Sequence, residues 1–261
     1  MDDYIRDYAG RKILLCSIYA NEMAEILKQK GIYQYEIPVE VWKREDVLSD
    51  DEIAHEKWPL YLQRLCDKPG MDVLELGSRV VTGANFRSLF SKARYVGFDY
   101  YEGENVDIVG DIHRVSQYFD HQFDLIFSSA VFEHLAMPWQ AALEIIKLLK
   151  PGGYVFIETH YAFGSHDRPW HFFQYSENAL HVLFPEKFGM RCLKKGCSNL
   201  LSGAEFSEEA CGYLQGQCVG GLYCHSEFLG QKTMQIKEEY LDWKNICLED
   251  VTGATKYPRK E

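Results

Sequence analysis

The stretch VLELGSRVVTG, residues 73–83, decides how the middle of the chain folds. It begins with apolar residues, reaches an acid at Glu75 and then a glycine at Gly77. This is the pattern of a buried parallel strand that delivers the chain to a ligand-binding loop. The glycines expected two and four positions after Gly77 are absent, and Gly83 follows only later. The stretch therefore predicts a strand and a loop, and by itself leaves open whether that loop binds a ligand.

Strands and helices alternate on the C-terminal side of this stretch. One helix is predicted to begin at residue 84. Two more are predicted at 138–150 and 176–184. Strands are predicted at 71–76, 93–99, 105–109, 123–129, 154–159, 191–196 and 221–229. Nearly continuous apolar strands that alternate with helices are typical of a parallel sheet covered on both faces. We therefore expect an α/β fold with a doubly wound, mostly parallel, Rossmann-like sheet.

The predicted elements divide the chain into three parts. Residues 1–68 are predicted to form a helical N-terminal cap, because apolar residues recur at helical spacing in 17–30 and 58–66. The Pro-Gly pair at 69–70 ends this part. Residues 69–230 contain the sheet, and residues 231–261 are expected to form a C-terminal helix and a polar tail.

Composition narrows the classes of partner. The chain has 261 residues, of which 46% are hydrophobic and 26% charged, and a formal net charge of −11. Such a surface repels phosphate backbones, so we expect no nucleic acid partner. No apolar run reaches the roughly 18 residues of a membrane span, and the acidic start MDDYIRDYAG differs from a signal peptide. We expect a cytoplasmic protein without membrane contact.

The cysteines indicate a reducing compartment. None of the eight forms a C-x-x-C pair, and the Cys192, Cys197 and Cys224-His225 positions match no standard zinc spacing. Reduced and mostly buried thiols in a cytoplasmic protein are the expected state.

Acidic residues follow three successive predicted strands. They are Glu75, Asp99 and Asp111. Ligands of a doubly wound sheet gather at the carboxyl ends of its strands. There Asp99 can accept hydrogen bonds from both hydroxyls of a ribose, and Asp111 can accept a hydrogen bond from an adenine amino group. A single acid at such a place is more often a turn former or helix cap, but three in order favour a nucleoside site.

Four stretches together resemble the class I S-adenosylmethionine-dependent methyltransferases, in their small-molecule branch. They are VLELGSR, GFDYYEGENVDIVGDIH, FDLIFSSAVFEHL and LLKPGGYVFIETH. The resemblance covers residues 71–160 well and the chain to about 230 loosely. It implies a seven-stranded sheet whose last strand is antiparallel, and S-adenosyl-L-methionine as cofactor.

The same resemblance implies a set of cofactor-binding residues. Glu75 and Gly77 would approach the methionine end, Asp99 would hold the ribose, and Asp111 with the Ile112 amide would hold the adenine. The full expected set is Glu75, Gly77, Ser78, Arg79, Asp99, Tyr100, Asp111, Ile112, Ser128 and Ser129. Only Gly77 matches the family's glycine-rich loop. S-adenosylmethionine carries no phosphate, so it does not need the close backbone approach that a dinucleotide needs.

Arg79 occupies the place where that loop departs from the family pattern. Its positive charge is unfavourable beside a sulfonium. We expect its side chain to face the carboxylate of the cofactor or a buried acid, or to brace the loop.

Histidines are dense after the fourth and fifth predicted strands. Transfer of a methyl group to a hydroxyl benefits from a general base, and imidazole titrates in the range that suits this work. The expected catalytic residues are His160, His134, His166 and His171. His166 and His171 could instead bind substrate, or hold a divalent metal together with His160 and Asp167, but we expect no metal.

The expected function is transfer of a methyl group from S-adenosyl-L-methionine to a small-molecule acceptor, most simply a hydroxyl oxygen of a sugar, metabolite or natural-product intermediate. Two alternatives stay open. One is a nicotinamide-dependent oxidoreductase on a related sheet, and the other is a non-catalytic scaffold with a methyltransferase-like fold.

Overall fold

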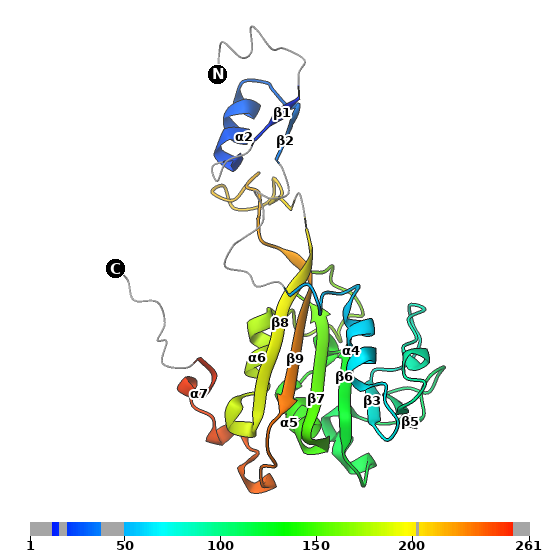
Figure 1. Cartoon of the computed structure of the whole chain (residues 1–261). Helices are drawn as coiled ribbons and strands as arrows, with labels where there is room; N and C mark the ends of the chain where they lie inside the picture. The colour runs from blue at the N-terminus through cyan, green and yellow to red at the C-terminus, as the bar shows by residue number, and fades with distance from the viewer. Residues whose placement is uncertain (1–11, 16–19, 38–49, 202–203, 253–261) are drawn as a thin grey trace. The chain divides into compact units, whose positions relative to one another are not determined.

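A computed structural model describes residues 12–15, 20–37, 50–201 and 204–252 of the chain (Figure 1). It contains two compact units. The first is Met1–Val47 with Leu200–Tyr223, and the second is Leu48–Asn199 with Cys224–Glu261. Each unit is described by itself.

The second unit is built on a seven-stranded sheet with the order β5-β4-β3-β6-β7-β9-β8 (Figure 1). Its strands are β3 (Asp72–Leu76), β4 (Arg94–Asp99), β5 (Ile108–Val109), β6 (Phe123–Ser129), β7 (Leu149–His160), β8 (Met190–Leu200) and β9 (Tyr223–Lys232). Five neighbouring strands of the sheet run parallel, namely β5, β4, β3, β6 and β7. Strand β9 pairs antiparallel with β7. The prediction of a doubly wound, mostly parallel sheet with an antiparallel last strand is confirmed.

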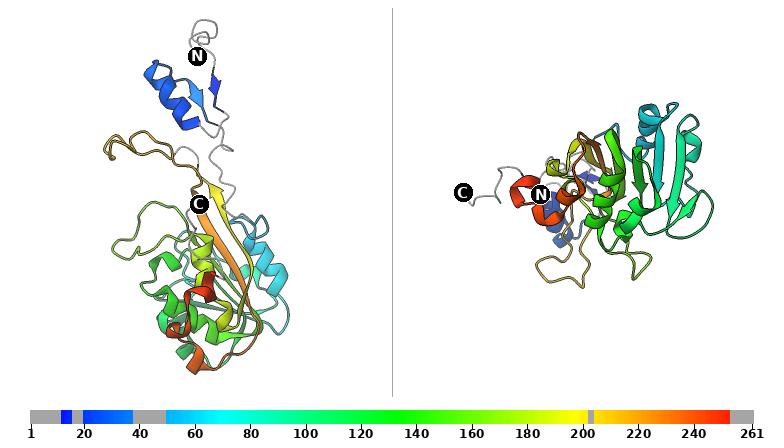
Figure 2. Two further views of the ribbon diagram at one scale, coloured as in Figure 1. Left: turned by 90° about the vertical axis from the view of Figure 1, so that its left-hand side faces the viewer. Right: turned by 90° about the horizontal axis from the view of Figure 1, so that it is seen from below.

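The central strands are apolar throughout because both faces of the sheet are covered. All five residues of β3 are buried. Since side chains alternate along a strand, Val73 packs in one core cluster and Leu74 in another. Helix α4 (Trp58–Cys66) contributes to the cluster around Val73, while α5 (Pro138–Leu148) and α6 (Glu177–Val182) contribute to the other (Figure 2).

Local rules explain two helix starts and one missing helix. Pro138 occupies the first turn of α5, and the Ser176 hydroxyl accepts from the Ala179 N–H at 3.2 Å to cap α6. The helix predicted from residue 84 is reduced to the short 3-10 helix η1 (Arg87–Leu89). There the Asn85 side chain accepts from the Arg87 N–H, a local bond that competes with helix formation.

The first unit is small and mixed. Strands β1 (Ile13–Leu14) and β2 (Tyr35–Glu36) pair in parallel, and α2 (Ala20–Gln29) packs through Ala20, Ala24 and Leu27. The glycine-rich connection between β8 and β9 belongs to the same unit.

The predicted division into 1–68, 69–230 and 231–261 therefore differs from the observed one. The N-terminal part holds strands as well as a helix, and α4 belongs to the sheet unit because Trp58, Leu62 and Cys66 pack in its core. At the C-terminus, the only α-helix among the described residues is α7 (Leu248–Thr252), and the tail from 253 onward lies outside them.

Two expectations from composition can be compared with the structure. No described helix combines the length and apolar character that a bilayer span requires. Of the seven described cysteines, Cys66 and Cys197 are buried, three are half-buried, and Cys211 and Cys247 are exposed, so the expectation of mostly buried thiols is wrong. Burial raises the pKa of Cys66 to about 12.

The position of α4 on the sheet can be tested with leucine-to-alanine substitutions at two positions of this helix. Leu62 is fully buried, whereas Leu60 is 52% exposed. Leu62→Ala should lower the free energy of unfolding by ~2–5 kcal/mol because it leaves a cavity. Leu60→Ala should change it by less than ~0.5 kcal/mol. Equal small effects in chemical denaturation would show that α4 is not part of the core.

Candidate functional site

The carboxyl ends of the parallel strands lie along one edge of the sheet. Gly77 follows β3, and Asp99, Ser129 and His160 end β4, β6 and β7. Strand β3 stands between β4 and β6, which is the point where the strand order reverses. Ligands of such sheets bind at this switch point.

Gly77 shapes the first loop at this edge. Its φ of +82° lies in the left-handed region, and a Cβ atom there would come within 2.1 Å of the Val131 side chain. The Gly77 and Ser78 N–H groups both donate to the Phe98 carbonyl. A glycine is therefore required for the loops after β3 and β6 to pack together.

Arg79 points at Asp99. The Arg79 backbone N–H donates to Asp99 Oδ2 at 3.2 Å, and Nε lies 3.6 Å from Oδ1. The Tyr101 N–H also donates to Oδ1, at 3.0 Å. The Arg79 guanidinium lies 5.5 Å from the centre of the Tyr101 ring. Of the expected orientations, the structure shows the one toward an acid, and that acid is the predicted ribose ligand.

Asp111 caps the 3-10 helix η2 (Ile112–Tyr118). It accepts from the His113 N–H at 2.9 Å and lies 2.7 Å from the His113 ring. Burial works against its charge, but the hydrogen bonds from His113 outweigh burial and hold the pKa of Asp111 below its ordinary value. Near this edge Tyr100 is exposed and Ile112 is buried.

Three residues of the expected cofactor set make hydrogen bonds inside the protein. Ser78 donates to the Asn105 carbonyl, and the fully buried Ser128 donates to the Leu76 carbonyl. Glu75 accepts from the Tyr95 hydroxyl, because its place in β3 directs it to the face of the sheet rather than its edge. Burial raises the pKa of Glu75 to about 8.

Ser129 takes part in a carboxylate network that the sequence analysis missed. It donates to Glu158, which also accepts from the Trp58 indole at 2.9 Å and lies 2.7 Å from the His55 ring. Glu227 stands opposite Glu158 on β9, and burial raises its pKa to about 8. An acid in the apolar run YVFIET was the only hint of this network.

Glu133 lies at the centre of the histidine-rich region. Its carboxylate is fully buried, accepts from the Thr159 hydroxyl at 2.5 Å and lies 2.9 Å from His160 Nδ1. Burial opposes the charge, but the contacts from His160 and Thr159 outweigh it and hold the pKa of Glu133 below its ordinary value. Its backbone carbonyl accepts from the Phe172 and Phe173 N–H groups, which attaches the loop to this point.

The structure brings the four predicted catalytic histidines together. The ring of His166 lies 4.6 Å from His171, 4.9 Å from His134 and 5.3 Å from His160, centre to centre. Phe163 stacks on His160 at 4.4 Å. Four imidazoles and a buried carboxylate thus form one cluster at the end of β7, which can bind protons or a metal ion.

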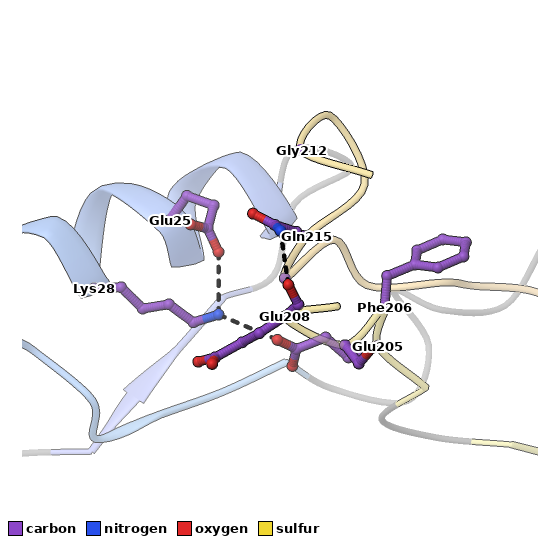
Figure 3. Close-up of a pocket in the computed structure, with 9 residues that line it drawn as sticks. Glu25, Lys28, Glu205, Phe206, Glu208, Gly212 and Gln215 are labelled. Atoms are coloured by element: carbon purple, nitrogen blue, oxygen red, sulfur yellow. Dashed lines mark hydrogen bonds and ion pairs between the residues drawn. The ribbon is translucent and has the colours of Figure 1, made fainter. Parts of the chain in front are cut away.

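The first unit has a separate pocket of about 500 Å³ (Figure 3). Its lining is polar, and Lys28 reaches between Glu25 and Glu205 at 3.1 and 3.5 Å. These contacts balance the charge of the lysine, and the lining has no histidine or cysteine. The histidine cluster of the second unit is therefore the richer of the two in groups that can transfer protons.

A family model described as a methyltransferase domain matches residues 51–196, more than half of the chain. A search of curated proteins gave no match. The match favours methyl transfer over the nicotinamide alternative.

Several solved structures are similar to the chain at low identity. The YcgJ protein from Bacillus subtilis is 17% identical, with 68% of this chain and 97% of that chain covered and a TM-score of 0.47. A SAM-dependent methyltransferase from Archaeoglobus fulgidus is 14% identical, with 69% and 97% covered and a TM-score of 0.46. The 1,6-didemethyltoxoflavin-N1-methyltransferase from Burkholderia thailandensis, solved with bound S-adenosylhomocysteine, is 14% identical, with 67% and 76% covered and a TM-score of 0.46.

The raised pKa of Glu75 predicts how stability depends on pH. Its carboxyl stays protonated up to about pH 8 in the folded protein, but ionises near 4.5 once the chain unfolds. Its contribution to stability is therefore full below pH 4.5 and is lost as the pH rises through about 8, at up to ~1.4 kcal/mol per pH unit.

Chemical denaturation of wild type and Glu75→Gln between pH 5 and 8 tests this. The variant should lose stability less steeply with rising pH, and adding Glu227→Gln should flatten the profile further. Parallel profiles of wild type and Glu75→Gln would mean that Glu75 is ionised in the folded protein.

Proposed function

The chain belongs to the methyltransferase-domain family, and from this premise we propose that it transfers a methyl group from S-adenosyl-L-methionine to a hydroxyl oxygen of a small-molecule acceptor. The contact between Glu133 and His160 is the observation that supports this proposal most strongly. His160 lies at the same edge of the sheet as Asp99.

The residues at the end of β4 fit the nucleoside part of this cofactor. Asp99 presents a carboxylate that is 14% exposed, and each oxygen has capacity beyond the bond it accepts from a backbone N–H. Such a group can accept from ribose hydroxyls. Tyr100, Asp111 and Ile112 would surround the adenine, and Gly77 would lie by the methionine part. S-adenosyl-L-methionine supplies a methyl group activated by its positive sulfur.

Arg79 gives Asp99 a second role. Its guanidinium lies beside the carboxylate and holds the Asp99 side chain in place at this edge, where a ribose would bind. The same arginine is close enough to this edge to face the carboxylate of the methionine part. Because S-adenosylmethionine has no pyrophosphate, the loop after Gly77 does not need further glycines and can carry the arginine side chain.

His160 is the proposed base. Glu133 contacts its Nδ1 side, which orients the ring and stabilises the positive charge that follows proton uptake. His160 Nε2 then takes the proton of the acceptor hydroxyl while the oxygen attacks the methyl carbon. Positioning of the two reactants supplies most of the rate, and base catalysis contributes a further ~10²–10⁴-fold.

Aromatic side chains favour a flat or apolar acceptor. Phe163, Trp170 and Phe172 lie on the loop that carries the histidines, and all three are exposed. Pockets for small molecules are lined largely by such side chains with a few polar groups among them. The net charge of −11 makes a polyanionic acceptor unfavourable.

The role of Asp99 predicts a loss of cofactor affinity. Asp99→Asn keeps the shape but loses charge-assisted bonds worth ~1.5–3 kcal/mol, so calorimetry should show S-adenosylmethionine binding ~10–100-fold more weakly. Asp120→Asn, at a fully exposed acid, is the control. Unchanged affinity in Asp99→Asn would remove Asp99 from the cofactor site.

The role of His160 predicts a loss of turnover without a loss of cofactor. Labelled cofactor can be incubated with the low-molecular-weight fraction of source cells, and the labelled product followed by mass spectrometry. His160→Ala should form that product at least ~100-fold more slowly, with unchanged S-adenosylmethionine affinity. His121→Ala, at a half-exposed histidine outside the cluster, should be unaffected. Full turnover by His160→Ala would refute the assignment of the base.

A further inference from the structure

Two histidines of the cluster have their tautomers fixed by backbone carbonyls. His134 Nδ1 lies 2.9 Å from the Trp170 carbonyl, and His166 Nδ1 lies 3.0 Å from the Gly164 carbonyl. A carbonyl oxygen can only accept, so each Nδ1 carries the proton and each Nε2 keeps a lone pair. Histidines that bind metals in proteins are held in this way, by a hydrogen bond from the nitrogen that does not bind the ion.

A carboxylate completes the set. His134, His166 and Asp167 each offer a ligand atom, and these atoms lie within 4.8 Å of one another. The rings of His134 and His166 are nearly perpendicular, at 89°. Asp167 has a φ of +47°, a left-handed backbone conformation that is uncommon for a residue other than glycine and that is often found at functional sites.

Two imidazoles and one carboxylate suit a divalent transition metal. Zinc–nitrogen and zinc–oxygen bonds are ~2.0–2.2 Å long. Ligand atoms within 4.8 Å therefore need only small side-chain rotations to meet one ion. Three protein ligands leave coordination positions open, which is the arrangement of catalytic rather than structural metal sites.

The other residues of the cluster are less suited to the ion. Glu133, His160 and His166 also place ligand atoms within 4.8 Å of one another. In that set, however, Glu133 and His160 already form a close pair, and Glu133 also accepts from Thr159. His171 Nδ1 accepts from the His166 backbone N–H at 3.3 Å, so the proton of neutral His171 is on Nε2 and neither nitrogen is available. His171 is therefore a neighbouring imidazole that is not a ligand.

We propose that His134, His166 and Asp167 bind a divalent transition metal ion, with open positions directed to oxygen atoms of the acceptor. Binding of the ion stands on its own, while its role in catalysis rests on the proposed function. With the ion beside it, His160 remains free to take the proton of the acceptor hydroxyl. The expected acceptor then carries a second oxygen next to the methylated one, because two adjacent oxygens can occupy two open positions.

Metal titration of the whole chain, prepared without a histidine tag and stripped with a chelator, tests the site. Zn²⁺ followed by calorimetry, and Co²⁺ followed by visible absorption, should show one ion per chain. His134→Ala and His166→Ala should each weaken Zn²⁺ binding by more than ~100-fold, since loss of a second-shell partner alone costs 10–100-fold. His171→Ala should bind Zn²⁺ like the wild type.

Further outcomes separate this proposal from the proposed function. Unchanged Zn²⁺ affinity in His134→Ala and His166→Ala, or a loss confined to His160→Ala and Glu133→Gln, would overturn the ligand assignment. Circular dichroism of each variant verifies the fold. Calorimetry with S-adenosylmethionine reports the cofactor site, and this affinity should be unchanged in His166→Ala. A protein that binds the cofactor and turns over normally after metal removal would keep its proposed function and refute the catalytic role of the metal, whereas failure to bind Zn²⁺ or Co²⁺ would refute the site itself.

Discussion

The fully buried carboxylate of Glu133 holds the candidate active site together. Through its side chain it contacts Thr159 and His160 at the end of β7, and through its backbone carbonyl it fixes the loop at Phe172 and Phe173. A buried charge is costly unless it is paired and hydrogen-bonded, so the surrounding groups are constrained to stay where they satisfy it. Glu133 thus connects His160 at the end of β7 to the loop that carries His166 and His171.

The glycine motif after β3 lies at the other end of the same edge of the sheet, and packing explains why it keeps Gly77. Gly77 is retained because the loop after β6 approaches it too closely for a side chain. The positions after it are free to change, and one of them, Arg79, holds the Asp99 carboxylate. A site for a nucleoside without phosphate groups can accommodate a side chain in place of a glycine, whereas a pyrophosphate site needs backbone N–H groups that the ligand can approach closely.

Features set by local patterns were predictable from the sequence, and features set by long-range contacts were not. Apolar runs gave the strands of the sheet, and turn chemistry gave the cap at Ser176. The two-residue strands β1 and β2 are too short to show a period. Burial of Glu75 depends on Tyr95 and Asn105, which no spacing rule connects to it. The histidines were predictable as a group, but the contact between Glu133 and His160 depends on the fold.

A crystal structure of the complex with S-adenosylhomocysteine tests the central claim most directly. We predict ribose hydroxyls within hydrogen-bonding distance of the Asp99 carboxylate, and the sulfur atom at the part of the sheet edge where His160 lies. A nucleoside bound away from Asp99, or a sulfur atom separated from His160 by the protein itself, would contradict it.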